Sequence, residues 1–198
     1  MRIAIFGASG RTGRKVIEQA LERGHDVTAF VRDASRFGTT HDALEVAEGD
    51  ARDPEAVGEA VRGKDAIISV LSLAKPEDEP QHSEATRTVV EALGRENVRR
   101  IVVTANNHVF GDDEVTGEFA AAAREHRRNR DLLRATGLGW TIGAAPSVVD
   151  EPGSGYEVVA DGKAPGKKIA TADFAAFTLD ALERDEWIGR VVGVSSVV

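Results

Sequence analysis

Three glycines near the start of the chain have the spacing of a nucleotide-binding turn. Gly7, Gly10 and Gly13 stand three residues apart and directly follow the apolar run at residues 3–6. From Val16 onward, apolar side chains recur with the period of a helix. A buried strand, a glycine turn and a helix form the first half of the βαβ unit that binds the pyrophosphate of a dinucleotide. The alternative is a glycine-rich turn that binds nothing.

Each glycine has a separate role in such a turn. Gly7 lets the backbone turn sharply out of the strand, and Gly10 lets N–H groups approach a phosphate without an intervening Cβ. Gly13 lets the helix pack close to the sheet. The unpaired N–H groups of the first helical turn, at the positive end of the helix dipole, would then bind the phosphates.

The end of the second expected strand, at residues 26–31, favours NADP over NAD. An NAD-specific site usually has an acidic residue there, which accepts hydrogen bonds from the ribose hydroxyls. This chain has Arg32 instead, with Arg36 shortly after it and Arg11 in the glycine turn. Guanidinium groups match a 2′-phosphate in geometry and charge. Asp33 would favour NAD if it pointed inward, and solvated surface charge is the other interpretation of the arginines.

Apolar runs typical of strands alternate with helical patterns along nearly the whole chain. Further strands are expected at residues 44–47, 66–71, 100–104, 140–144, 156–160 and 190–194, and helices at 54–61, 82–94, 118–135 and 172–184. This order predicts one α/β domain over residues 1–198, with the doubly wound parallel sheet of the NAD(P)-binding Rossmann fold. Residues 146–198 are expected to contribute the cover on the substrate side.

Composition excludes several kinds of site. The 198 residues include no cysteine, so thiol catalysis, disulfides and thiolate metal sites are excluded, and the five histidines lack metal-ligand spacing. The net charge of −8 argues against nucleic acid as the main partner. No apolar run approaches the roughly 20 residues of a membrane span. Because the first strand begins at Arg2, no signal peptide is expected, and the protein is expected to be cytoplasmic.

The catalytic pair of ordinary short-chain dehydrogenases is missing from this sequence. That pair is a tyrosine with a lysine four residues later, and the lysine lowers the tyrosine pKa so that the hydroxyl exchanges a proton with a carbonyl. The only tyrosine here is Tyr156, which lies beyond the expected strand at 140–144 and is followed four residues later by Ala160. Alcohol–ketone chemistry by this pair is therefore not expected.

Several longer stretches match one group of proteins in register along nearly the whole chain. They include Ile-Ala-Ile-Phe-Gly-Ala-Ser-Gly-Arg-Thr-Gly at residues 3–13, Val-Arg-Asp-Ala-Ser-Arg at 31–36 and Asp-Gly-Lys-Ala-Pro at 161–165, with shorter matches at 49–50, 64–67 and 133–138. The chain resembles the NAD(P)H-binding atypical short-chain dehydrogenase/reductase group, in particular its biliverdin reductase B or flavin reductase (NADPH) branch. The resemblance implies NADPH as cofactor, hydride transfer to a small molecule, and a monomer or weak homodimer.

The resemblance also implies which residues hold the cofactor. The glycine turn would hold the pyrophosphate, the arginine after the second strand the 2′-phosphate, the Gly-Asp after the third strand the adenine, and the end of the fourth strand the ribose and nicotinamide. The candidate cofactor-binding residues are Gly7, Ser9, Gly10, Arg11, Thr12, Gly13, Arg32, Arg36, Asp50, Ala51, Leu71, Ser72 and Pro146.

Two polar groups that the group uses near its substrate are replaced here. Asn106 stands where the group has a serine, and Ser147 stands where it has a histidine. An asparagine donates a hydrogen bond but supplies no proton, whereas the nearby His108 has a suitable reference pKa of about 6.5 unless it is a surface histidine. Asn106, His108 and Ser147 are the catalytic candidates, and their identities disfavour tetrapyrrole reduction more than flavin reduction.

Two functions remain open at this stage. The first is an NADPH-dependent reductase of a flavin-like, quinone-like or related conjugated acceptor. The second is an NADP(H)-binding redox sensor without turnover, similar to NmrA-type regulators. The basic segment at residues 124–130 is interpreted as a solvent-exposed helix face. The acidic segment at residues 75–80 is interpreted as a surface loop, with a border of the substrate mouth as the alternative.

Overall fold

The computed structural model describes residues 1–72, 80–111 and 114–197. An eight-stranded sheet runs through the molecule in the order β3-β2-β1-β4-β5-β6-β10-β8. Its strands are β1 (Arg2–Phe6), β2 (Asp26–Val31), β3 (Leu44–Glu48), β4 (Ala66–Ser69), β5 (Arg100–Asn106), β6 (Gly139–Ala145), β8 (Tyr156–Ala160) and β10 (Arg190–Ser196). The acidic segment at 75–80 lies, except for Pro80, outside the described residues.

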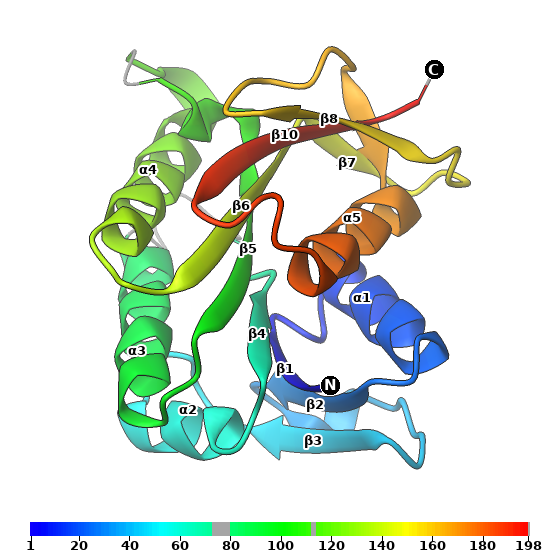
Figure 1. Cartoon of the computed structure of the whole chain (residues 1–198), viewed down its shortest axis with the longest axis vertical. Helices are drawn as coiled ribbons and strands as arrows, with labels where there is room; N and C mark the ends of the chain where they lie inside the picture. Colours follow the sequence, from blue (N-terminus) through cyan, green and yellow to red (C-terminus); the bar gives the residue numbers. More distant parts are fainter. Residues whose placement is uncertain (73–79, 112–113, 198) are drawn as a thin grey trace.

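Helices cover both faces of this sheet, as Figure 1 shows. One layer contains α1 (Arg11–Glu22) and α5 (Thr171–Glu183), and the other contains α2 (Pro54–Val61), α3 (Gln81–Arg95) and α4 (Ala120–Arg134). In the described ranges, short 3-10 helices lie in the connections: η1 (Ala34–Arg36), η3 (Asn107–Val109) and η4 (Gly117–Phe119). This arrangement confirms the predicted single-domain α/β fold of the Rossmann type.

Alternation along the central strands builds the two layers of the core. In β1, Ile3 and Ile5 pack in the cluster that includes α1 and α5, and Ala4 and Phe6 pack in the cluster that includes α2 and α3. All four side chains are fully buried. Burial of a large apolar side chain stabilises the fold by about 1.5–3 kcal/mol, so a strand with two apolar faces is fixed between both helical layers.

The connection between β1 and α1 has no space for side chains at two glycines. Gly7 has a φ of +82°, and a Cβ there would lie 2.7 Å from the carbonyl oxygen of Val70. A Cβ at Gly13 would lie 2.2 Å from the carbonyl oxygen of Gly7. Glycine at both positions therefore lets α1 begin directly against the ends of β1 and β4.

The region after Pro146 differs from the sequence-based expectation. β10 pairs in parallel with β6, and β8 pairs with β10 in the antiparallel direction, so the sheet is not entirely parallel. β7 (Ser147–Val149) and β9 (Lys168–Ala170) form a separate two-stranded parallel sheet that was not predicted. Residues 146–197 thus complete the main sheet and, through α5, one helical layer. That this region also covers the substrate side stays a prediction.

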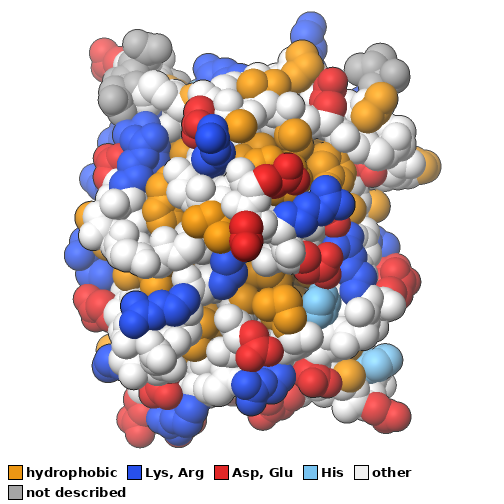
Figure 2. All heavy atoms as spheres, in the orientation of Figure 1, with side chains coloured by type: hydrophobic (Ala, Val, Ile, Leu, Met, Phe, Trp, Pro, Cys, Tyr) orange, Lys and Arg blue, Asp and Glu red, His pale blue; other side chains and the backbone are white. Residues whose placement is uncertain are grey.

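The surface and the helices give two further observations. Figure 2 shows acidic and basic side chains interspersed on the face that it views, with apolar side chains between them. Across the described ranges, every helix falls short of the length and apolar character that crossing a bilayer requires.

We expect Gly13→Ala to lower the free energy of unfolding by about 2–3 kcal/mol, because the added methyl group has to displace backbone atoms. Gly94→Ala is the matched control, since a Cβ at this position in α3 has no atom within 4 Å. The control should raise stability by about 0.5–1 kcal/mol. Urea unfolding followed by circular dichroism measures both, and equal midpoints for the two variants would contradict the close packing at Gly13.

Candidate functional site

A cleft of about 250 Å³ opens at the carboxyl ends of the central strands. It lies where the strand order reverses, because β1 has β2 on one side and β4 on the other. In open α/β sheets, ligands bind at this switch point. The lining residues are Gly7, Ser9, Gly10, Phe30, Val31, Arg32, Gly49, Asp50, Ala51, Arg52, Val70, Leu71, Ser72, Gln81, His82 and Ala85.

Most of the predicted cofactor-binding residues meet in this cleft. Those that line it are Gly7, Ser9, Gly10, Arg32, Asp50, Ala51, Leu71 and Ser72. The others lie elsewhere: Thr12 and Gly13 in the first turn of α1, Arg36 at the end of η1, and Pro146 between β6 and β7. Nη2 of Arg11 donates a hydrogen bond of 2.9 Å to the carbonyl oxygen of Val148, which joins the first turn of α1 to β7.

The start of α1 is built to accept an anion. Gly10 is the N-cap residue and provides no side-chain hydrogen bond, and the first turn contains no acidic residue. The N–H groups of this turn therefore have no side-chain acceptor at the N-cap, and they lie at the positive end of the helix dipole. A phosphate group fits these donors.

Two charged side chains that line the cleft, Asp50 and Arg52, form an ion pair. Nε and Nη2 of Arg52 donate hydrogen bonds of 3.0 and 2.6 Å to the two carboxylate oxygens of Asp50. This pairing, together with the charge of Arg32, lowers the pKa of Asp50 to about 2, so the carboxylate is ionised at neutral pH. Asp33 is not among the residues that line the cleft, and its Oδ1 accepts hydrogen bonds from the N–H and hydroxyl of Ser35.

The α3 wall of the cleft was missed by the sequence analysis. His82 is buried there, and its ring contacts Asn129 at Nδ1 and the carbonyl oxygen of Leu71 at Nε2. An amide nitrogen only donates, so Nδ1 accepts from Asn129, and Nε2 carries the proton that it donates to Leu71. Burial lowers the pKa of His82, which keeps the ring neutral. The histidine thus fixes the end of β4 against α3.

The basic segment at residues 124–130 is only partly solvent-exposed, so its interpretation as an exposed helix face was wrong. Its inner face buries Glu125, His126, Asn129 and Arg130. These residues recur at the four-residue spacing of one helix face, and this is the signal that could have revealed their burial.

Three contacts show what α4 does. Glu125 accepts a 2.6 Å hydrogen bond from the N–H of Ser83 in the first turn of α3, and so caps a helix whose own N-cap residue supplies no side-chain bond. Nη1 of Arg130 donates to the carbonyl oxygen of Val109 at 2.9 Å, and Nε of Arg127 donates to that of His108, also at 2.9 Å. α4 therefore positions both the α3 wall and the turn that carries His108.

The three catalytic candidates lie near the ends of β5 and β6, outside the lining of the cleft. Asn106 is the last residue of β5 and pairs in register with Ala145, the last residue of β6, and the exposed Ser147 begins β7 two residues later. Oδ1 of Asn106 accepts a 3.0 Å hydrogen bond from the N–H of His108, which directs its amide nitrogen to other acceptors. Burial and the charges of Lys163 and Arg127 lower the pKa of His108.

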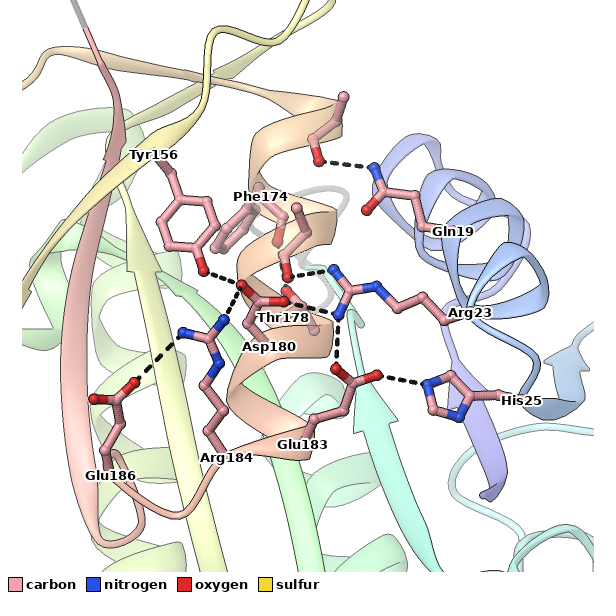
Figure 3. A network of polar contacts seen from close by, with 12 residues as sticks. Gln19, Arg23, His25, Tyr156, Phe174, Thr178, Asp180, Glu183, Arg184 and Glu186 are labelled. Carbon is pink, nitrogen blue, oxygen red and sulfur yellow. Dashed lines mark hydrogen bonds and ion pairs between the residues drawn. The ribbon is translucent and has the colours of Figure 1, made fainter.

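Tyr156 is held in a structural network on the side of α1 and α5, as Figure 3 shows. Its hydroxyl donates to the carboxylate of Asp180, and burial, together with this hydrogen bond, raises the tyrosine pKa. Nη1 of Arg23 bonds both Asp180, at 2.8 Å, and Glu183, at 2.9 Å. His25 contacts the other oxygen of Glu183 at 2.8 Å. The hydroxyl thus stays protonated and joins β8 to α5, while Arg23 joins α5 to α1.

Comparison with known proteins identifies the family. A family model described as NAD(P)H-binding matches residues 7–185. The chain belongs to the NAD(P)H-binding family. The uncharacterized protein YwnB of Bacillus subtilis (strain 168) is 30% identical to it over 205 residues, which cover 94% of each chain.

Two solved structures share the fold of this NAD(P)H-binding protein. One, from Streptococcus pneumoniae TIGR4, carries the provisional name NADH-flavin reductase; it has a TM-score of 0.84 and 24% identity over 100% of both chains. The other is a short-chain dehydrogenase/reductase from Veillonella parvula DSM 2008 in complex with NADP, with a TM-score of 0.82 and 18% identity over 98% of this chain and 94% of that one.

The cleft of this NAD(P)H-binding protein fits the family's cofactor on independent grounds. Gly7 lines the cleft with backbone alone, because a Cβ at this position would clash with the backbone of Val70 and Leu71. The uncapped start of α1 supplies N–H donors for a pyrophosphate, and Arg32 supplies a cation at the end of β2.

Acid is expected to destabilise the protein through His126, which is buried in α4. Burial, together with repulsion from His82 and His108 when these rings are protonated, lowers the pKa of His126 from 6.5 to about 3. Between these two values the unfolded chain binds a proton that the folded protein rejects, so stability falls as pH drops below about 6.5. At pH 5 the loss amounts to about 2 kcal/mol.

His126→Gln should remove this contribution, and urea unfolding at pH 7 and pH 5 measures it. The difference in unfolding free energy between the two pH values should shrink by about 2 kcal/mol in the variant. His41→Gln, at an exposed position, serves as the control and should keep the wild-type difference. An unchanged difference in the His126 variant would show that another group causes the acid sensitivity.

Proposed function

We propose that this protein is an NADPH-dependent reductase that transfers a hydride to a flavin-like, quinone-like or related conjugated acceptor. One observation carries the proposal: the cleft keeps a cofactor cradle, while the only tyrosine is bound to Asp180 and has no lysine four residues later. Without a Tyr–Lys pair, proton exchange with an alcohol or ketone has no catalyst of that type. The protein is thus an atypical short-chain reductase, and its acceptor is one whose reduction depends mainly on ring positioning.

The cofactor assignment rests on Arg32. This guanidinium lines the cleft and, among the residues that the structure describes, has no hydrogen-bond or ion-pair partner. It binds the 2′-phosphate, while the glycine turn and the start of α1 bind the pyrophosphate and Leu71 and Ser72 border the nicotinamide ribose. When bound, NADPH supplies the hydride for the acceptor.

The acceptor lies against the ends of β5 and β6. The amide nitrogen of Asn106 donates a hydrogen bond to an acceptor oxygen or nitrogen, and Ser147 donates or accepts another. His108 is neutral at physiological pH because its pKa is lowered, so it serves as a hydrogen-bond donor more than as an acid. Protonation of a reduced flavin or quinone comes from water, and these residues orient the ring.

An aromatic pair beside this region supports a planar acceptor. The rings of His108 and Phe119 lie 5.6 Å apart with an interplanar angle of 31°, and Phe119 is 52% exposed. A large exposed aromatic side chain offers a flat face on which a conjugated ring stacks. The exposed Lys163 lies close enough to lower the pKa of His108, and the N–H of Asp161 fixes its loop to Val191 of β10 at 2.7 Å. These features favour a planar acceptor with an anionic group, such as FMN.

The first test follows NADPH oxidation at 340 nm with purified protein and excess FMN. We expect faster oxidation of NADPH than of NADH, and Arg32→Ala should weaken NADPH binding about 10- to 100-fold while leaving NADH binding unchanged. Arg62→Ala, an exposed arginine outside the cleft, should behave as wild type. Equal affinities for both cofactors in the wild type, unaffected by Arg32→Ala, would refute the cofactor assignment. Tight NADPH binding without turnover would instead favour the redox-sensor function.

A second test concerns the acceptor. Phe119→Ala should raise the KM for both FMN and riboflavin, because stacking does not depend on the phosphate. Lys163→Ala should raise the KM for FMN about tenfold and leave that for riboflavin unchanged, because only FMN carries the anion. Lys167→Ala removes a nearby exposed lysine as the control. If Lys163→Ala affects both flavins equally, the lysine does not bind the phosphate.

A further inference from the structure

Three charged side chains meet at one end of the cleft. Arg32 follows β2, and Asp50 and Arg52 come from the short connection between β3 and α2. All three line the cleft, on the side where the proposed cofactor would place its adenosine. The sequence analysis assigned roles to Arg32 and Asp50 and none to Arg52.

Arg52 occupies the carboxylate of Asp50 with three hydrogen bonds. Its backbone N–H and its Nε donate to Oδ1 at 2.8 and 3.0 Å, and its Nη2 donates to Oδ2 at 2.6 Å. A guanidinium that bonds both oxygens of a carboxylate forms the strongest and most directional kind of ion pair. The negative charge of Asp50 is therefore compensated by Arg52, a residue of the same turn.

The other acidic groups around Arg32 are also engaged elsewhere. Asp33 caps η1 through Ser35, at 3.0 Å from the N–H. Glu48, the last residue of β3, accepts a 2.8 Å hydrogen bond from the N–H of Ala34. Asp33 follows Arg32 in the chain and Glu48 pairs with the preceding Val31, yet within the described part of the chain Arg32 forms no ion pair with either residue or with Asp50.

We propose that Arg52 sets the preference for NADPH by neutralising Asp50, which leaves Arg32 free to bind the 2′-phosphate. Without Arg52, Asp50 would be an uncompensated anion in the same cleft. It would attract the Arg32 guanidinium and repel a phosphate, and it would also accept hydrogen bonds from ribose hydroxyls as the acidic residue of NAD-specific sites does. Arg52 acts through Asp50, so it is a positioning residue and not a direct phosphate ligand. The inference rests on the proposed cofactor.

Two mononucleotides isolate this end of the cleft. Adenosine 2′,5′-bisphosphate and 5′-AMP differ only in the 2′-phosphate, and their dissociation constants are measured by isothermal titration calorimetry at low ionic strength. We expect Arg52→Ala to reduce the preference for the bisphosphate about tenfold, the effect of losing one charge-assisted contact. The double variant Asp50→Asn/Arg52→Ala should restore the preference to within about twofold of wild type, because the asparagine carries no charge. Asp50→Asn alone should not reduce it.

The rescue distinguishes neutralisation from other roles of Arg52. If Arg52→Ala weakens both nucleotides equally and Asp50→Asn does not reverse the loss, Arg52 contacts the base or supports the fold, and the inference is overturned. If Arg52→Ala retains its affinity for 5′-AMP, the cleft of this variant is still folded. Arg32→Ala tests the proposed function separately. If it leaves the preference unchanged, the 2′-phosphate assignment fails, whereas a loss with Arg32→Ala and none with Arg52→Ala rejects only the role of Arg52.

Discussion

The close approach of α1 to the ends of β1 and β4 is the constraint on which the rest of the structure depends. Backbone atoms of Gly7 and Val70 lie where a side chain would otherwise stand, and Gly13 packs on the carbonyl of Gly7. This contact sets the direction of α1, directs the N–H groups of its first turn toward the cleft, and holds the ends of β1 and β4 side by side. The cleft, its glycine cradle and its position on the sheet all follow from it.

The opposite end of α1 is fixed by charge. Arg23, the C-cap residue, bonds Asp180 and Glu183 of α5, and Tyr156 of β8 bonds the same Asp180. The helix is therefore held by backbone packing at its start and by a partly buried ionic network at its end. On the other face, Glu125 and Asn129 of α4 hold the first turn of α3 and the ring of His82. Both walls of the cleft thus rest on contacts that lie outside it.

The sequence predicted the parts of this protein whose signal is local. Apolar runs located the strands of the main sheet and the glycine spacing located the turn, because both signals depend on neighbouring residues. The antiparallel direction of β8 could not be predicted, since it depends on β10, which follows later in the chain. The burial of one face of α4 could not be predicted, because its residues are charged. Glu125 and Arg130 are of types usual at a surface, and their burial is explained only by their partners on α3 and in the turn after η3. Arg52 likewise gains a role only beside Asp50 and Arg32.

The strand order also has a consequence for the time course of folding. β6 ends at Ala145 and β10 begins at Arg190, yet β10 lies between β6 and β8 in the sheet. During synthesis, the outer edge of β6 therefore leaves the ribosome well before its partner, and β8 has no strand to join until β10 has been made. An unpaired edge in a partly made sheet attracts other chains. We therefore expect the late insertion of β10, which pairs with the open edge of β6, to be a slow and aggregation-sensitive step of folding.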